Sequence, residues 1–371
     1  MTCPFPLFRL LFWIFSVFIQ TIKSLLISNI PLPPPPFPFF RLPYLPLARI
    51  IDFMDPDALV SLSFCSQKTH SVIKTQRRAP FTGRLCVSWA NRDVLFHSVK
   101  NLTRVLRACY DWHHSYSNKI NHVKMNGLYV PVRVHPSDGY LVSCWENETK
   151  GMKTITQYVT DLFNIDVSEV WASKESFHLI EWVNRRQKTP LKKVIYMACS
   201  IWPSENKKMI YLLKDCTILS EICICSDAPL DFRFSGNFRR IDCLDIWHGQ
   251  WVTIDNLLTM DGIDIILGSS SLSNSDLNVF LRHWLSGGCP RLKLFCARTG
   301  SVDIFQVLDG LMHNANFVED RRDYTSPFGY RRTLTSGFDI QRADGVTATV
   351  CEQGNGSLAI AVWPESTYNY N

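Results

Sequence analysis

The second half of the chain contains a succession of short apolar segments, and this feature most restricts how the chain can fold. The segments recur at intervals of about 20 to 29 residues, and stretches with the apolar spacing of a helix lie between most of them. Strand, turn and helix repeated in this way predict parallel strands with helices outside them, because each unit buries its apolar faces only by stacking on its neighbours. The apolar segments are residues 167–171, 194–199, 222–225, 241–246, 263–267 and 292–296.

The helices between these segments have clear start signals. Thr253 and Ser273 lie where side chains commonly cap a helix N-terminus. The spacing is irregular and no ladder of Asn residues is present, so the array is a degenerate relative of the leucine-rich-repeat pattern. We therefore predict an α/β fold with an irregular leucine-rich-repeat-like array. The expected helices are residues 177–186, 209–213, 254–258 and 275–285.

Antiparallel strand segments are expected at both ends of this array. Before it, residues 102–110 are compatible with a helix instead, and residues 152–163 have the spacing of a helix with one buried face. After it, residues 338–350 predict a hairpin, because Asp344-Gly345 is a strong turn signal. The expected strands before the array are residues 84–89, 94–99, 128–134 and 140–145, which are separated by segments rich in Asn, Pro, Asp and Gly.

The first 40 residues differ in composition from the rest of the 371-residue chain. Only two of them are charged, and the apolar run at residues 10–19 is shorter than the roughly 20 residues of a membrane-spanning helix. The hexamer FPLFRL at residues 5–10 recurs as FPFFRL at residues 37–42, which favours a local duplication, or a non-coding stretch included in the gene model, over a membrane anchor. We expect residues 1–38 to be an extension that is disordered or weakly helical.

Residues 39–80 predict three short helices. Pro46 suits a first helical turn, where its missing N–H is not needed, and Asp55 can then cap a second helix and Ser66 a third. Three short helices bury little surface on their own, so we expect a partner to cover their apolar stripe. That stripe, on one face of the first helix, consists of Leu47, Ile50, Ile51 and Met54.

This segment resembles an F-box. The resemblance rests on Leu42-Pro43, the apolar stripe, the helix break at Asp55-Pro56 and the run LSFCSQK that begins at Leu62. The spelling is similar to the nematode F-box family, whose members dock on the Skp adaptor of an SCF-type cullin–RING ubiquitin ligase. The resemblance therefore implies a Skp-type adaptor and, through it, a cullin as partners. Carried over by position, the docking residues are Leu42, Pro43, Leu47, Ile50, Ile51 and Met54.

Later segments resemble the type 2 F-box-associated region of the same family. They are residues 155–163, 251–258, 272–285 and 338–350. The resemblance implies a substrate-recruiting module but leaves its substrate and its substrate-binding residues unknown. The expected organisation is an F-box at 39–80, a β-rich connector at 81–150 and an F-box-associated, leucine-rich-repeat-like domain at 151–365.

The sequence carries no recognisable catalytic, cofactor or metal motif. It has no phosphate-binding glycine loop, dinucleotide fingerprint, nucleophile elbow or zinc-binding helix. Cys223 and Cys225 lack a second pair at metal spacing, and strand alternation places both on one face of a buried strand. A net charge of +6, from 39 basic and 33 acidic residues, is too small to indicate a nucleic-acid surface. We therefore expect no catalytic, cofactor or metal site and no nucleic-acid partner.

Dibasic pairs are frequent in the second half of the chain. If several converged on one face, they could bind an acidic or phosphorylated segment, because guanidinium groups match phosphate oxygens. Scattered solvated charge is the simpler interpretation, and exposed aromatic residues on the sheet would recruit a protein equally well. The pairs are 185–186, 192–193, 207–208, 239–240, 321–322 and 331–332.

The function favoured by these expectations is that of a non-catalytic adaptor. The ligase would hold a substrate lysine near a thioester on another subunit, so this chain needs no nucleophile of its own. The 13 cysteines are odd in number and mostly lie in apolar runs, which favours reduced thiols and an intracellular, cytoplasmic or nuclear location without membrane attachment. Alternatives are a membrane-anchored interaction module that uses residues 10–30, and a scaffold that does not bind the adaptor because its F-box is degenerate.

Overall fold

The computed structural model describes residues 41–98, 101–110, 120–173, 175–197, 206–216, 220–228, 232–354 and 356–364. The expectations for residues 1–38 and for the apolar run at 10–30 lie outside this part of the chain. Internal contacts divide the chain into two compact units, Met1–Val167 (unit 1) and Ser168–Asn371 (unit 2), which are described separately. No helix in the described ranges has the length and apolar content that crossing a bilayer requires.

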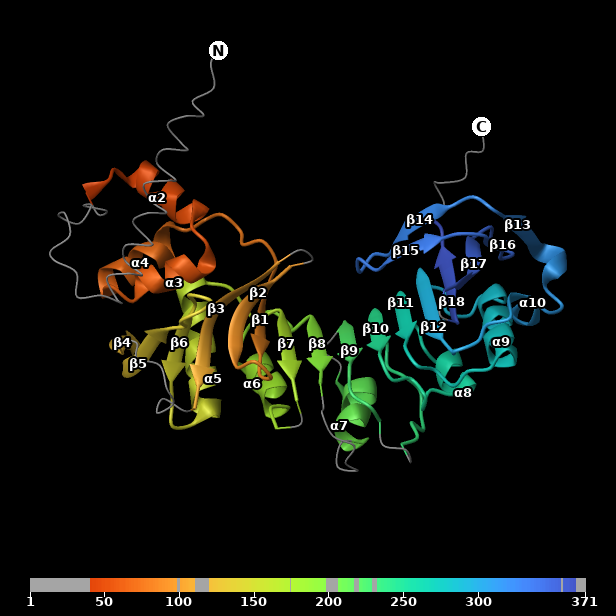
Figure 1. The fold of residues 1–371 in the computed structure, drawn as a ribbon, viewed down its shortest axis with the longest axis horizontal. Coiled ribbons are helices and arrows are strands. Elements are labelled where there is room, and N and C mark those ends of the chain that lie inside the picture. Colours follow the sequence, from red (N-terminus) through yellow and green to blue (C-terminus); the bar gives the residue numbers. More distant parts are fainter. Residues whose placement is uncertain are drawn as a thin grey trace, which may run out of the picture. The chain divides into compact units, whose positions relative to one another are not determined.

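Unit 1 begins with three short helices and continues as a small sheet (Figure 1). The strand order is β1-β2-β3-β6-β5-β4, and all neighbours are antiparallel except β3 and β6, which are parallel. Helices α3 and α5 pack on β3. The elements are α2 (Tyr44–Phe53), α3 (Pro56–Ser63), α4 (Gln67–Gln76), β1 (Arg84–Ser88), β2 (Asp93–His97), β3 (Leu102–Cys109), β4 (Asn121–Met125), β5 (Leu128–Val134), β6 (Leu141–Cys144) and α5 (Glu148–Phe163).

Two sequence interpretations in unit 1 are corrected by the structure. Residues 102–110, read as compatible with a helix, contain strand β3. A β-bulge in β3, at Val105 opposite Val94 and Leu95 of β2, shifts the pairing of the two strands, so the apolar residues of β3 do not alternate regularly and mimic helical spacing. Strand β4 was not expected, because its residues are mostly polar and partly exposed.

Unit 2 opens with six parallel strands that follow one another in chain order, β7-β8-β9-β10-β11-β12. Helices connect most of them, and both predicted caps are confirmed: Thr253 and Ser273 form capping boxes with Asn256 and Asp276. The elements are β7 (Glu169–Ala172), α6 (His178–Arg186), β8 (Lys193–Tyr196), α7 (Asn206–Ile210) with a following π-helical turn (Tyr211–Asp215), β9 (Glu221–Ile224), β10 (Cys243–Ile246), α8 (Ile254–Leu258), β11 (Asp264–Leu267), α9 (Asn274–Leu285) and β12 (Leu294–Arg298).

The two faces of these six strands differ in chemistry. One face is apolar and buried, with Val170, Val194, Ile222, Leu244, Ile265 and Phe295 in register across the strands. It faces the helices, as the 4.5 Å between the ring centroids of Phe280 on α9 and Phe295 shows. The opposite face carries charged and thiol groups, with Glu169, Lys193, Glu221, Cys243 and Asp264 in one row. Alternation along each strand therefore separates a core side from a polar side.

The C-terminal part of unit 2 is antiparallel. Strand β18 pairs with β12 and extends the sheet in the order β12-β18-β17-β16-β13. The predicted hairpin at 338–350 is confirmed as β16 and β17, and Gly345 in its turn has φ +89°. The elements are α10 (Ile304–Val307), a 3-10 turn (Met312–Asn314), β13 (Ala315–Val318), β14 (Arg322–Thr325), β15 (Arg331–Leu334), β16 (Gly337–Gln341), β17 (Thr347–Gln353) and β18 (Ser357–Val362).

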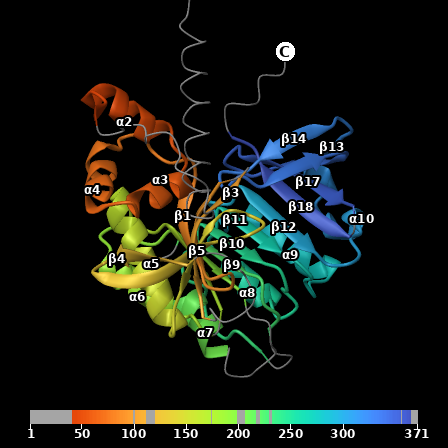
Figure 2. The same cartoon turned by 60° about the vertical axis from the view of Figure 1, so that its left-hand side comes forward.

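The β14–β15 hairpin covers part of the polar face of unit 2. Tyr324 and Leu334 from the hairpin pack against Leu294 and Cys296 of β12 and against Ala359 of β18. The helices α8 and α9 lie on the other side of the same strands (Figures 1 and 2). The hairpin therefore converts this end of the sheet into a three-layer structure.

Candidate docking surface on the first helices

Helix α2 is positioned by its own sequence and by the end of α4. Pro43 occupies the N-cap position and α2 ends at Phe53. Arg77 donates from Nη1 to the carbonyl oxygens of Ile51 and Asp52, at 2.9 and 3.2 Å. These contacts satisfy carbonyl groups that the end of a helix leaves without an intrahelical partner.

The side chain of Asp52 completes this attachment. Its Oδ1 accepts the backbone N–H groups of Arg78 and Ala79 at 2.8 and 2.9 Å. Burial raises the pKa of Asp52, but these two hydrogen bonds and the nearby charges of Arg77 and Arg49 outweigh that effect, so the pKa lies below its ordinary value. The carboxylate therefore stays ionised at neutral pH and holds the end of α4 against α2.

Helices α3 and α4 begin where the sequence indicated, but by different means. The Ser66 hydroxyl accepts from the Thr69 N–H at 3.1 Å, as predicted for the cap of α4. Asp55 occupies the N-cap position of α3, yet its side chain makes no capping hydrogen bond there. The start of α3 depends instead on Pro56, whose fixed φ suits a first helical turn.

The chain itself covers the inner side of these helices. The Ser63 hydroxyl of α3 lies 2.8 Å from the Tyr158 hydroxyl of α5, and Lys74 of α4 donates to Asp161 of α5 at 2.5 Å. Burial raises the pKa of Tyr158 to about 12, so it remains a neutral phenol. Helix α5 thus belongs to the same compact unit as the first helices, and that unit ends at Val167. The domain boundary expected from the sequence lies at residue 150, before most of α5.

The structure divides the six sequence-predicted docking residues between two sides of α2. Leu47, Ile51 and Met54 are buried in unit 1, with Ile51 at 0% exposure. Leu42 and Ile50 are half-buried, and Pro43 is exposed. The stripe at helical spacing is thus mainly the inner face of α2.

The outer face of α2 carries apolar residues that the sequence reasoning did not single out. Tyr44, Leu45 and Phe53 are 51%, 72% and 61% exposed. Leu45 and Phe53 are eight residues apart, so they lie on one helical face outside the stripe. The sequence signal that could have identified this face is a second apolar row on a short helix. Together with Pro43, these residues form an exposed apolar surface of the kind that marks a protein contact.

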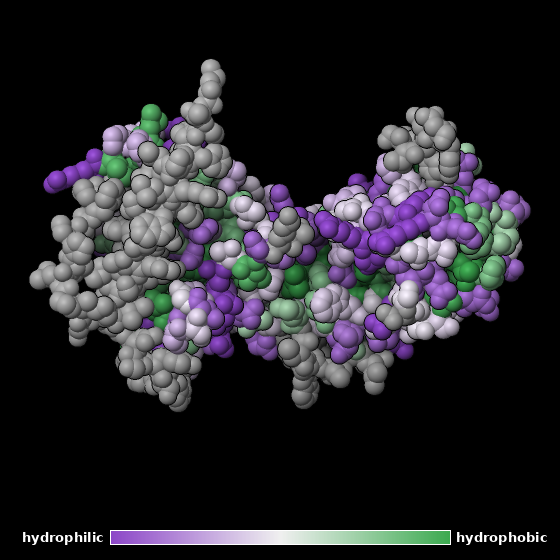
Figure 3. Space-filling model, turned by 45° about the horizontal axis from the view of Figure 1, so that its top comes forward, coloured by the Kyte–Doolittle hydropathy of each residue, from purple (hydrophilic) through white to green (hydrophobic). Residues whose placement is uncertain are grey.

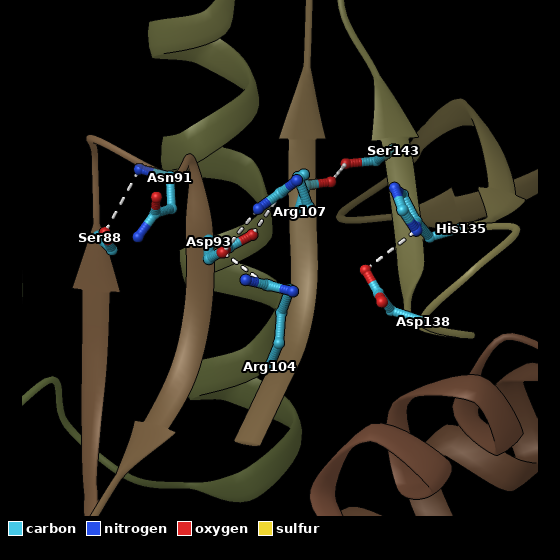
Figure 4. Close-up of polar contacts among 8 residues, drawn as sticks. All are labelled: Ser88, Asn91, Asp93, Arg104, Arg107, His135, Asp138 and Ser143. Atoms are coloured by element: carbon cyan, nitrogen blue, oxygen red, sulfur yellow. Dashed lines mark hydrogen bonds and ion pairs between the residues drawn. The ribbon is translucent and has the colours of Figure 1, made fainter. Parts of the chain in front are cut away.

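A charged cluster on the sheet of unit 1 was also missed (Figure 4). Asp93 on β2 has a fully buried side chain and accepts from Arg104 Nε at 2.6 Å and from Arg107 Nε and Nη2 at 2.8 and 3.1 Å. In a regular strand residues three apart point to opposite faces, and the bulge in β3 at Val105 lets both guanidinium groups meet one carboxylate. The side-chain hydrogen bond with Asp93 raises the pKa of Arg107. Both carboxylate oxygens are engaged, so this cluster holds the strands together and offers no free base.

Unit 2 has two carboxylates beneath the β14–β15 hairpin, the buried Asp264 and the half-buried Asp245. The Ser326 hydroxyl donates to Asp264 Oδ2 at 2.5 Å, and the Tyr330 hydroxyl donates to Asp245 Oδ2 at 2.8 Å. Burial raises the pKa of Asp264 to about 6, although the Ser326 hydrogen bond opposes the shift. Burial also raises the pKa of Asp245. These hydrogen bonds tie the hairpin to β10 and β11.

The predicted cysteine and dibasic features have local structural roles. Cys223 and Cys225 lie on one face of β9 and its extension, with 3.5 Å between the sulfur atoms. Within the described ranges no group of His, Cys, Asp and Glu is arranged to hold a metal ion. Several arginines of the dibasic pairs have separate partners. Arg185 donates to Glu181, and Arg239 donates to the carbonyl oxygen of Leu212. Arg322 donates to Asp339, and Arg332 donates to the sulfur of Cys296.

Comparison with known proteins agrees with this organisation. The model of the F-box domain family matches residues 39–80, which contain α2, α3 and α4. The model described as F-box associated matches residues 233–297, from the region before β10 to β12. The chain carries an F-box and an F-box-associated region.

A curated relative extends the similarity beyond these two matches. The Skn-1 dependent zygotic transcript 15 protein of Caenorhabditis elegans is 25% identical over 340 residues, which are 87% of this chain and 96% of the relative. No solved structure matches this chain. Neither matched family is a catalytic domain.

Proposed function

We propose that the protein is a non-catalytic substrate adaptor of an SCF-type ubiquitin ligase inside the cell. In this proposal the F-box docks a Skp-type adaptor, which connects it to a cullin, and unit 2 binds a protein substrate. The observation that carries the proposal is the F-box match at residues 39–80 on three helices whose outer face presents exposed apolar side chains.

The docking contact is proposed to use Leu42, Pro43 and Ile50 directly, together with Leu45 and Phe53 on the same helix. Leu47, Ile51 and Met54 would act from within, because they set the position of α2 from its buried side. This division explains why a short helix can be apolar on two faces: one face folds the unit and the other meets a partner.

Unit 2 is proposed to act as a leucine-rich-repeat-like recruiting surface. Six parallel strands in chain order, with helices on their apolar face, support this interpretation. The opposite face is polar and partly covered by the β14–β15 hairpin. Proteins built in this way use the surface that the helices leave uncovered to hold partners.

The test uses full-length protein and purified Skp-type adaptor. Leu45→Asp with Phe53→Asp should abolish complex formation in size-exclusion chromatography, because each buried apolar side chain contributes about 1–2 kcal/mol and each new carboxylate must be desolvated. Ile51→Asp is a poor probe, because a charge at a position with 0% exposure would unfold the helices. Val279→Asp, at a 46% exposed position on α9, is the matched control and should bind normally.

Two outcomes of this experiment would reject the proposal. If the wild-type protein does not bind the adaptor, the scaffold alternative is favoured. If the double variant binds as well as the wild type while both remain folded, the outer face of α2 is not the docking surface. The membrane-anchored alternative concerns residues 10–30 and is tested separately by carbonate extraction of cell membranes.

A further inference from the structure

Strand β13 is an edge of the unit 2 sheet. It pairs with β16 on one side, and its other side pairs with no strand in the described part of the chain. Proteins usually guard such an edge by keeping the strand very short, or with a charged residue, a proline or a bulge. Strand β13 is short, with the four residues Ala-Asn-Phe-Val, but it contains no charged residue and no proline. Its free backbone groups are therefore open to an added strand.

One face of this edge is apolar and exposed. Phe317 of β13 is 57% exposed, and its ring centroid lies 5.3 Å from that of Phe338 on β16. Phe305 of α10 is 64% exposed and lies 6.1 Å from the same Phe338 ring. The end of unit 2 at the right of Figure 3 accordingly shows hydrophobic residues among hydrophilic ones. Exposed aromatic clusters of this kind favour protein contacts.

The same edge borders a cavity of about 920 Å³. Asn316, Phe317 and Val318 of β13 all line it, and alternation points the side chains of Asn316 and Val318 to the face opposite that of Phe317. On the floor, Arg322 donates to both oxygens of Asp339, at 3.0 and 2.7 Å, so these two charges neutralise each other.

The remaining charge of the cavity is negative. Glu319, Asp320 and Asp344 complete the charged part of its lining, which therefore holds four carboxylates and one guanidinium. Asp344 is paired with Arg342, whereas Glu319 and Asp320 are exposed and form no ion pair within the described ranges. A group that enters this cavity beside β13 therefore meets uncompensated negative charge.

We infer that β13 binds an extended segment of a protein ligand in which basic and apolar residues alternate. The segment adds as a strand to β13, its Lys or Arg side chains enter the cavity toward Glu319 and Asp320, and its apolar side chains lie against Phe317 and Phe305. Main-chain hydrogen bonds give affinity in this binding mode, and the pockets for alternate side chains give specificity. The inference rests on the proposed function in one respect: it assigns this segment to the recruited substrate.

The probe is a fluorescein-labelled peptide of eight residues with alternating Lys and Val, used below the concentration at which it self-associates. Its binding to the full chain is followed by fluorescence anisotropy, with and without the Skp-type adaptor. A peptide with alternating Glu and Val tests the charge, and a peptide with four Lys followed by four Val tests the alternation. We expect both control peptides to bind at least tenfold more weakly.

Charge reversal in the cavity identifies the site. Glu319→Lys with Asp320→Lys should weaken binding of the Lys–Val peptide at least tenfold, and Phe317→Ser should weaken it as well. The matched control, Asp309→Lys with Glu352→Lys, reverses two exposed carboxylates outside the lining and should leave binding unchanged.

The outcomes separate this inference from the proposed function. Equal binding of the Lys–Val and Glu–Val peptides, or no effect of the cavity variant, overturns the inference even if the Skp-type adaptor still binds. Failure to bind the adaptor rejects the proposed function, while peptide binding to the chain alone still supports the site on β13. Sedimentation velocity tests whether β13 instead pairs with a second copy of the chain. Self-association that the peptide does not disrupt would show such pairing and would also overturn the inference.

Discussion

Asp264 should make the stability of unit 2 depend on pH in a defined direction. Its side chain is fully buried, and its pKa rises from 3.8 to about 6 in the folded protein. A group whose pKa is raised on folding stabilises the fold when it is protonated, and this contribution is lost as the pH rises from about 4 to about 6. Above that range the folded protein carries a buried carboxylate, and the shift of about 2 pKa units corresponds to about 3 kcal/mol.

Asp264→Asn removes this titration and keeps the size of the side chain. Any weaker pairing of the amide with Ser326 does not depend on pH, so the pH dependence of the difference between variant and wild type isolates the carboxylate. The free energy of unfolding of the variant, relative to that of the wild type, should rise by about 1.5 kcal/mol between pH 5 and pH 7.5. This is about half of the roughly 3 kcal/mol that corresponds to the whole pKa shift. Urea denaturation followed by tryptophan fluorescence measures it.

The matched control is Asp309→Asn, at an exposed position of the same unit, which should show the pH dependence of the wild type. If the difference between Asp264→Asn and wild type stays constant within about 0.5 kcal/mol over this range, burial of Asp264 does not govern its ionisation and the reasoning is wrong.

Two further changes in unit 1 have predictable effects on stability. Asp93→Asn should lower the free energy of unfolding by about 3 kcal/mol, because it leaves the guanidinium groups of Arg104 and Arg107 without their carboxylate, and urea denaturation would contradict this if the loss were below about 1 kcal/mol. Gly151→Ala should lower the melting temperature, because its Cβ would lie 2.6 Å from Trp145, and this overpacking outweighs the helix propensity gained; Gly354→Ala, with no atom within 4 Å, should have no such effect.

The first helices could be placed from sequence because their signals are local. Pro56 and Ser66 act on the turn that follows them, so the ends of α3 and α4 need no knowledge of the rest of the fold. The inner and outer faces of α2 could not be separated in this way. Which face is buried depends on α4, against which α2 packs, and α4 is in turn held by α5, which lies about ninety residues later, through Lys74 and Asp161.

Strand β3 shows why a sequence pattern can mislead. Its pairing with β2 shifts at the bulge, and Val105 and Leu106 are consecutive buried residues, as on the inner face of a helix. The same irregularity brings Arg104 and Arg107 to Asp93, so the ion cluster was hidden for the same reason. The β14–β15 hairpin was equally out of reach, because its contacts with β10 and β11 join residues some sixty to eighty-five positions apart.

The contact between α5 and the F-box helices has a consequence for how damaged copies of this protein would behave. Since Tyr158 and Asp161 help to hold α3 and α4, unfolding of unit 1 dismantles the helix bundle that supports the outer face of α2. Under the proposed function, a copy that has lost its fold therefore also loses the surface with which it would enter the ligase. Unfolded copies would then no longer compete for the Skp-type adaptor, and the adaptor would bind only folded copies.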